Sequence, residues 1–157
     1  MKLFFRFMVL AIWALSCAST CEKYDPDIYH DTDGNRVELI GRWGLTEVEY
    51  HTAGLVERRQ VSPTSLMEFI RGDRGKTLSK EDDGSWKEEG TFRYEVYRGS
   101  VTIFTEEEWE NNRGLSDEDS EYERGKTYNF KVKDENTIYY REKVSEGSYL
   151  VNCLTRF

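Results

Sequence analysis

Short runs of alternating apolar and polar side chains occupy the chain from about Val37 onward. In residues 91–97, Phe92, Tyr94 and Val96 alternate with polar side chains, and residues 127–133 repeat the pattern. A period of two is that of an antiparallel strand with one buried and one solvated face. No segment shows the 3.6-residue period of a long amphipathic helix. The pattern therefore predicts an all-β domain.

Turn residues separate these runs at short intervals. Glycine-containing turns are expected at 51–54, 72–75, 82–84, 98–99 and 146–147. They leave about eight or nine strands. The last run, 148–156, is apolar on both sides, so both of its faces are expected to be covered. Consecutive hairpins predict an antiparallel up-and-down eight-stranded barrel over residues 37–157, because a closed barrel has no free edge.

One segment, residues 106–124, interrupts the strand pattern with nine acidic side chains. A connection of this length inside a compact domain is usually functional or mobile. Residues 106–112 are predicted to form a helical turn or two, with Trp109 packed onto the domain. Ser116 to Asp119 can cap a second turn.

The first 16 residues have the pattern of a secretory signal peptide. Lys2 and Arg6 accompany a nine-residue apolar run, 7–15. This run has the length of a signal-peptide core and is far too short to span a membrane. Residues 14–17, Ala-Leu-Ser-Cys, resemble the bacterial lipobox. Cys17 is therefore the expected lipidation site.

Lipidation predicts a membrane anchor. The resemblance to bacterial lipoproteins implies several acyl chains on Cys17, and each buried methylene contributes about 0.8 kcal/mol. In the sorting rule of such proteins, Ala18 after the lipidated cysteine implies the outer membrane. The polar residues 17–36 are then expected to be a tether. Lipidation at Cys21, or cleavage near Ala18 without a lipid, are the alternatives.

Composition restricts the classes of partner. The 157-residue chain carries a formal net charge of −8 and 14% aromatic residues. An acidic surface repels phosphate backbones, so no nucleic acid is expected as a partner. The aromatic content argues against a disordered chain. Oligomeric state is left open.

Cysteine and histidine are sparse, and no catalytic centre is indicated. Cys21 and Cys153 can form a disulfide in an oxidising compartment, or Cys153 is a small buried residue and Cys21 a free thiol. His30 and His51 adjoin no cysteine, so no zinc site is expected. Residues 31–35 begin like a calcium loop but lack its later ligands. No nucleophile motif is present. The chain is expected to be no enzyme and to hold no metal or cofactor.

The start and the end of the domain carry a family resemblance. Gly41-Arg42-Trp43 opens the first long strand, and Arg156 stands near the end of the last. Together with the Gly-x-Trp-x-Leu of residues 41–45 and the Gly-Thr-Phe of residues 90–92, they resemble the lipocalin-like domain of small Bacteroides-type envelope lipoproteins, a calycin-like β-barrel. The resemblance implies that Trp43 closes the barrel base and that Arg156 packs across it beside Gly41.

A barrel of eight strands, as the resemblance implies, has an interior that is either filled by side chains or holds one small ligand. Six aromatic residues are candidates to line it: Trp43, Phe92, Tyr94, Tyr128, Phe130 and Tyr149. They either edge a pocket for a small apolar or aromatic ligand or fill the core. The first interpretation predicts a ligand-binding protein. The alternative is an envelope interaction or glycan-binding module that uses the acidic loop 106–124 and exposed aromatic residues. A hydrolase is the least favoured class.

Overall fold

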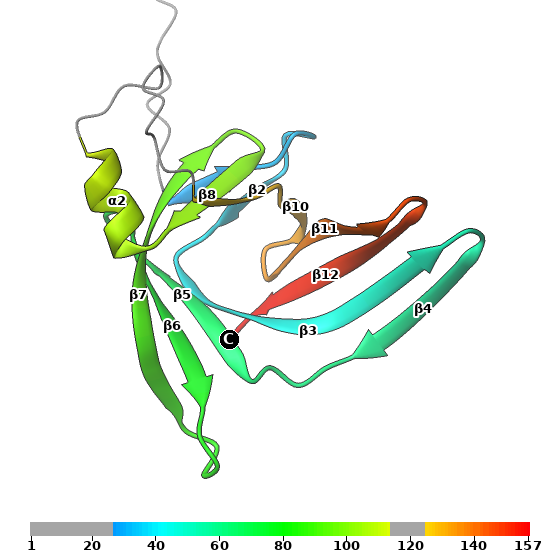
Figure 1. Cartoon of the computed structure of the whole chain (residues 1–157), viewed down its shortest axis with the longest axis horizontal. Helices are drawn as coiled ribbons and strands as arrows, with labels where there is room; N and C mark the ends of the chain where they lie inside the picture. Colours follow the sequence, from blue (N-terminus) through cyan, green and yellow to red (C-terminus); the bar gives the residue numbers. More distant parts are fainter. Residues whose placement is uncertain (1–26, 114–124) are drawn as a thin grey trace, which may run out of the picture.

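The computed structural model describes residues 27–113 and 125–157 (Figure 1). Within these ranges the chain forms twelve strands and one short helix. The expected signal peptide, Cys17, Cys21 and residues 114–124 of the acidic segment lie outside the described residues. The described part of the chain contains no helix that is long and apolar enough to cross a membrane.

From β3 onward the strands follow the predicted hairpins, whereas β1 and β2 lie in the predicted tether. In chain order the elements are β1 (Ile28–His30), β2 (Arg36–Glu38), β3 (Gly41–Thr52), β4 (Leu55–Gln60), β5 (Ser65–Ile70), β6 (Arg74–Lys80), β7 (Trp86–Tyr97), β8 (Ser100–Phe104), α2 (Glu106–Asn112), β9 (Lys126–Tyr128), β10 (Lys131–Asp134), β11 (Thr137–Ser145) and β12 (Ser148–Arg156).

Ten of these strands form one antiparallel sheet. Its order is β10-β11-β12-β3-β5-β6-β7-β8-β9, and β4 pairs with β3 beside this path. β4 and β5 follow one another along β3, and β9 and β10 are separated by two residues only. If β4 with β5 and β9 with β10 are each counted as one interrupted strand, the ten strands occupy eight positions around the sheet. The predicted all-β, up-and-down order is confirmed, with β12 paired to β3.

The sheet curves into a half-barrel, and its wall is open along β4. The sequence predicted a closed barrel without free edges, but β4 pairs with β3 alone among the described strands. Pro63 stands in the break between β4 and β5. Proline cannot donate a ladder hydrogen bond, which is consistent with the strand stopping there. In Figure 1, β3 and β4 extend away from the hairpin of β6 and β7.

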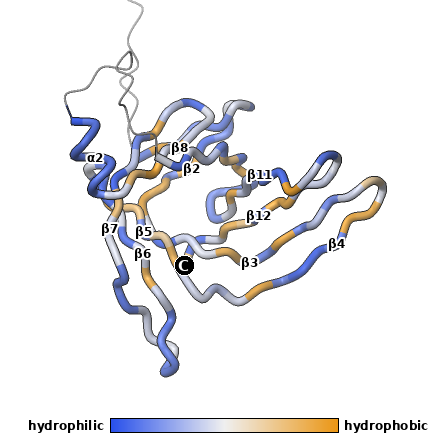
Figure 2. The backbone as a smooth tube through the Cα atoms, in the orientation of Figure 1, coloured by the Kyte–Doolittle hydropathy of each residue, from blue (hydrophilic) through white to orange (hydrophobic). Residues whose placement is uncertain are grey.

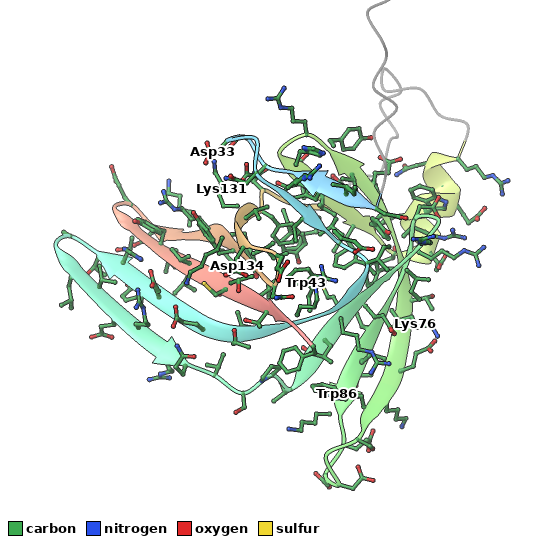
Figure 3. All side chains as sticks on the ribbon, turned by 180° about the vertical axis from the view of Figure 1, so that it is seen from behind. Asp33, Trp43, Lys76, Trp86, Lys131 and Asp134 are labelled. Carbon is green, nitrogen blue, oxygen red and sulfur yellow. The ribbon has the colours of Figure 1, made fainter. Side chains whose placement is uncertain are left out.

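The hairpin of β1 and β2 packs onto the barrel and corrects the expected tether boundary. Tyr29 is fully buried, and its hydroxyl donates to the carbonyl of Phe130 at 2.7 Å. Asp31 is also fully buried and accepts from the backbone N–H of Val132 at 3.1 Å. Lys131 pairs with Asp33 at 2.6 Å above it (Figure 3). Residues 28–36 are thus part of the domain, because buried long-range contacts hold this polar segment.

Aromatic and aliphatic side chains fill the interior beneath this hairpin. The cluster contains Tyr29, Val37, Leu39, Trp43, Phe69, Phe92, Tyr94, Val101, Phe130, Ile138 and Leu154. Edge-to-face contacts recur within it, as between Phe69 and Tyr94 at 5.0 Å. Gly75 leaves space for Phe92, since a Cβ at this position would lie 2.1 Å from the Phe92 ring. The upper part of the half-barrel is therefore a packed core.

The short helix in the acidic segment is confirmed. Thr105 caps α2: its Oγ1 accepts from the Glu108 N–H at 3.1 Å, and the Glu108 side chain accepts from the Thr105 N–H at 2.7 Å. This reciprocal pair is a capping box. Trp109 packs against Phe104 with ring centroids 5.6 Å apart, as predicted. The expected second cap at residues 116–119 lies outside the described residues.

Candidate functional site

A bulge in β3 decides which side chains face the interior. Leu45 pairs with Leu154, whereas Glu47 pairs with Cys153, so Thr46 is an additional residue in this strand. Such a bulge shifts the alternation of side chains by one. Below it, Val48 and Tyr50 therefore continue the inner face that Trp43 and Leu45 begin.

A concave site lies on this inner face beside β4. Its volume is about 610 Å³ and it is partly open to solvent. The lining residues are Val48 and Tyr50 of β3, Glu57, Arg58 and Arg59 of β4, and Val61 just after β4. Register places Val48 opposite Arg59 and Tyr50 opposite Glu57. The volume of the site lies within the range of small-molecule sites. Its apolar side chains come from β3 and from Val61, and its oppositely charged side chains, Glu57 and Arg59, come from β4.

Asn152 adds a buried polar group to the same face. It lies opposite Val48 on β3 and opposite Tyr140 on β11. Directly opposed residues in an antiparallel pair project to the same side. Asn152 is only 6% exposed, and its Nδ2 has no hydrogen-bond partner within the described part of the chain. A buried amide N–H without an acceptor is costly and is therefore uncommon in folded proteins.

Arg58 projects to the opposite, outer face, where it belongs to an ion-pair network. Its Nε donates to Glu49 at 2.7 Å, and it also pairs with Glu47 at 3.6 Å. His51 lies 3.0 Å from Glu49. The hydrogen bond from His51 and the charge of Arg58 outweigh partial burial and hold the pKa of the Glu49 carboxyl below its usual value. Although Arg58 borders the concave site, its guanidinium is bound to these glutamates, so Glu57 and Arg59 are the charged side chains that face the site.

The base of the half-barrel brings together the three residues that the resemblance placed there. The Arg156 guanidinium lies 4.6 Å from the centroid of the Trp43 ring. Arg156 also donates to the carbonyl of Ile40 at 2.6 Å and to that of Glu38. A Cβ on Gly41 would lie 3.0 Å from the Arg156 Nη1, and the φ of Gly41 is +128°. Glycine is favoured here because this backbone conformation is strained for other residues.

The predicted interior residues lie mostly in the core rather than at the concave site. Trp43, Phe92, Tyr94 and Phe130 are buried members of the cluster, and Tyr128 packs against it. Burial raises the pKa of Tyr94 to about 12. These side chains fill the upper interior and none lines the concave site described above.

The prediction that Tyr149 lines the interior is wrong, because this side chain lies on the outer face of β12. Its ring stacks on that of His51 with centroids 4.5 Å apart, next to Arg141. Residues 149, 151 and 153 share the outer face of β12, because the inner face carries Asn152 and Leu154. The alternation within this strand was visible in the sequence, but which side is enclosed was not.

The concave site consists of residues that the sequence analysis did not single out. Val48 and Tyr50 stand in the long run 41–52, where the bulge conceals their period. Asn152 offers a signal that was available: it is a lone amide inside the apolar run 149–154. Glu57 and Arg59 look like ordinary exposed-strand charges in the sequence.

Cys153 is a free, buried thiol on the outer face, and burial raises its pKa. The other half of the possible disulfide, Cys21, lies outside the described residues. Cys153 lies opposite Glu47, and His51 lies four residues further along β3, about 13 Å away at the usual rise per residue of a strand. Cys153 and His51 therefore form no catalytic dyad. The described ranges contain no group of three or more potential metal ligands.

Comparison with known proteins yields two structural likenesses. A lipocalin-like protein from Bacteroides uniformis ATCC 8492 is 18% identical; the match covers 76% of this chain and 98% of that chain, with a TM-score of 0.43. Japanin from Rhipicephalus appendiculatus, solved with bound cholesterol, is 14% identical over 73% of this chain and 74% of that chain, with a TM-score of 0.35. No protein-family model matches the chain. No curated protein matches it either. The fold assignment rests on the strand pairing described above.

Proposed function

We propose that this chain is a non-catalytic binding protein for a small amphipathic molecule held on the inner face of the half-barrel. The observation that carries the proposal is the concave site of about 610 Å³. Beside it, on the same face of the sheet and opposite Val48, Asn152 buries an unpartnered Nδ2. Sites for small molecules combine an apolar surface with a few polar groups that orient the ligand.

The side chains of the site specify the chemistry of the ligand. Val48, Val61 and the ring of Tyr50 offer apolar contact. The Asn152 amide lies behind Val48 on the neighbouring strand and lacks an acceptor, which a carbonyl, ester or carboxylate oxygen of a ligand that reaches past Val48 would supply. Arg59 at the edge of the site favours an anionic or strongly polar end. A compact apolar body with an oxygen-bearing polar group satisfies all three requirements.

The proposed location rests on the sequence. The signal-peptide pattern and Cys17 support export and lipid anchoring at the outer membrane. An anchored binding protein would hold its ligand close to a bilayer, from which amphipathic molecules partition. Anchoring is tested separately, by metabolic labelling with an alkynyl fatty acid in the wild type and in Cys17→Ser.

Ligand binding is tested with a fluorescent amphiphile. We expect 1-anilinonaphthalene-8-sulfonate to bind the purified chain with enhanced fluorescence at one saturable site. Val48→Arg places a charged side chain on the apolar wall and should weaken the binding at least tenfold, which corresponds to about 1.4 kcal/mol. Val144→Arg is the matched control, because Val144 lies at 52% exposure near the turn between β11 and β12.

Two results would contradict the proposal. One is equal loss of probe binding in Val48→Arg and Val144→Arg, which indicates nonspecific association. The other is a native mass spectrum, recorded on protein purified from its own cells, that shows only the bare chain together with no saturable probe binding.

A further inference from the structure

The edge of β4 is exposed along its whole length. All six residues of β4 are exposed, and among the described strands β4 has β3 as its only neighbour. Figure 1 shows no described strand running along the side of β4 that faces away from β3. An edge strand of this kind presents unpaired backbone N–H and C=O groups and can pair with another strand.

The hydrogen-bond pattern identifies the backbone groups at this edge. The Val61 N–H donates to the carbonyl of Thr46 at 2.9 Å. Because bonded residues alternate in an antiparallel pair, residues 57 and 59 also direct their backbone groups toward β3. Residues 56, 58 and 60 then direct their N–H and C=O groups outward. A strand that pairs with this edge must place residues whose backbone N–H and C=O groups point toward β4 opposite residues 56, 58 and 60.

A second copy of β4 fits this edge in one register. With Arg58 opposite Arg58 of the second copy, Glu57 lies opposite Arg59 and Arg59 opposite Glu57, so two reciprocal ion pairs form on the inner face. The same register places the exposed Leu55 opposite Val61. Shifting the register by one repeat places Glu57 opposite Glu57 or Arg59 opposite Arg59, and like charges directly opposed are unfavourable.

The outer face tolerates this register. The two Arg58 side chains meet there, and each is already bonded to Glu49 and paired with Glu47 of its own chain. The partial neutralisation reduces their mutual repulsion. Figure 2 shows the centre of β4 as hydrophilic and the β3–β4 turn as hydrophobic. Charged residues at the centre favour register specificity over indiscriminate aggregation.

We propose that two copies of this chain associate through antiparallel pairing of their β4 edges, with Arg58 on the two-fold axis. The two sheets become continuous, and the two concave sites adjoin one another across Glu57 and Arg59. Antiparallel pairing of identical strands gives a closed, self-complementary interface. Six residues per copy bury less area than a stable soluble dimer needs, so the association is weak and concentration-dependent.

Sedimentation equilibrium tests the association on the full chain in detergent over a concentration range up to about 1 mM, which covers weak interfaces. We expect a reversible monomer–dimer equilibrium. Glu57→Arg alone and Arg59→Glu alone each convert two attractive cross-strand pairs into repulsive ones. Each should weaken dimerisation about tenfold or more. The double variant Glu57→Arg/Arg59→Glu should restore it.

The matched control for Glu57→Arg is Glu89→Arg, an exposed charge reversal on β7 that makes the same change in net charge. It should leave the association unchanged, and the unfolding temperature of every variant is measured to show that it folds. A wild-type chain that stays monomeric at all concentrations overturns the proposal. The proposal is also overturned if the dimer dissociation constant is the same in the two single variants and in the double variant.

Disulfide trapping tests the register. In the background Cys17→Ser/Cys21→Ser, Arg58→Cys should form a covalent dimer on mild oxidation, because directly opposed Cα atoms of a hydrogen-bonded pair lie about 5.5 Å apart. Val56→Cys is the control, since the two copies of residue 56 would lie about 13 Å apart in this register. Equal or preferential cross-linking at residue 56 overturns the proposed register.

Discussion

Replacing Asn152 with leucine should stabilise the ligand-free protein. The two side chains are similar in size, and Asn152 is 6% exposed with an unpartnered Nδ2. A buried donor without an acceptor costs about 1–3 kcal/mol. Leucine removes that cost and adds apolar contact to Tyr140 and Val48, which lie opposite on the neighbouring strands. We therefore expect Asn152→Leu to raise the free energy of unfolding by about 1–3 kcal/mol.

The gain should appear in both denaturant and thermal unfolding. For a domain of this size, about 1 kcal/mol shifts the midpoint of thermal unfolding by about 3–5 °C. Urea titration followed by tryptophan fluorescence should show a higher midpoint with an unchanged slope. Asn136→Leu is the control: Asn136 lies in the turn between β10 and β11, and its replacement should bring no comparable gain.

The same substitution should weaken ligand binding. Loss of one neutral hydrogen bond to the ligand lowers affinity by about threefold to tenfold. Stability and binding would then change in opposite directions, as expected where a polar group is retained for function. If Asn152→Leu instead lowers the free energy of unfolding by 1 kcal/mol or more, its amide is satisfied in the folded chain and the reasoning fails.

Three further changes test the core, the base and the pH response. Gly75→Ala should destabilise the fold by about 1–3 kcal/mol in urea titration because its Cβ meets the Phe92 ring, and Phe92→Leu in that background should recover part of the loss. Arg156→Lys keeps the charge over Trp43 but not the guanidinium fork that contacts two carbonyls, so it should cost about 1–2 kcal/mol by the same assay; no loss would contradict the described base. Burial opposes ionisation of Asp31, but hydrogen bonds from backbone and side-chain N–H groups outweigh it and lower the pKa of the carboxyl. The stabilisation of the fold by the Asp31 carboxylate is therefore complete above the ordinary Asp pKa of about 3.9 and is lost as pH falls through the lower pKa of the folded chain. Asp31→Asn should be less stable than the wild type at neutral pH and lose less stability on acidification, and parallel pH profiles of the two proteins would contradict this.

Local patterns in the sequence were sufficient for most of the strands from β3 onward and for their up-and-down order. The turn glycines and the period of two predicted the hairpins, and the Thr105 cap with Glu108 produced the short helix that was expected at 106–112. These features depend on residues that are close together in the chain. Gly41, Trp43 and Arg156 were paired only through the family resemblance, and the structure places them in contact.

The hairpin of β1 and β2 could not be found from local patterns. Residues 28–36 contain few apolar side chains and read as a polar tether. Their burial depends on partners about a hundred positions away, such as Phe130 for Tyr29 and Val132 for Asp31. A buried aspartate that accepts several N–H bonds looks the same in a sequence as an exposed one.

The amino-acid sequence by itself determined an all-β chain of consecutive hairpins, because side-chain period and turn chemistry are properties of neighbouring residues. The tertiary structure alone decided where the barrel is open and which face is enclosed. The Thr46 bulge sets the side chains that face inward, and the interruption at Pro63 separates β4 from the wall. The bulge arises where β3 pairs with β12, about a hundred positions away in the chain, and this pairing places Val48, Tyr50 and Asn152 on one face. The edge of β4 is free because, among the described strands, β4 pairs with β3 alone.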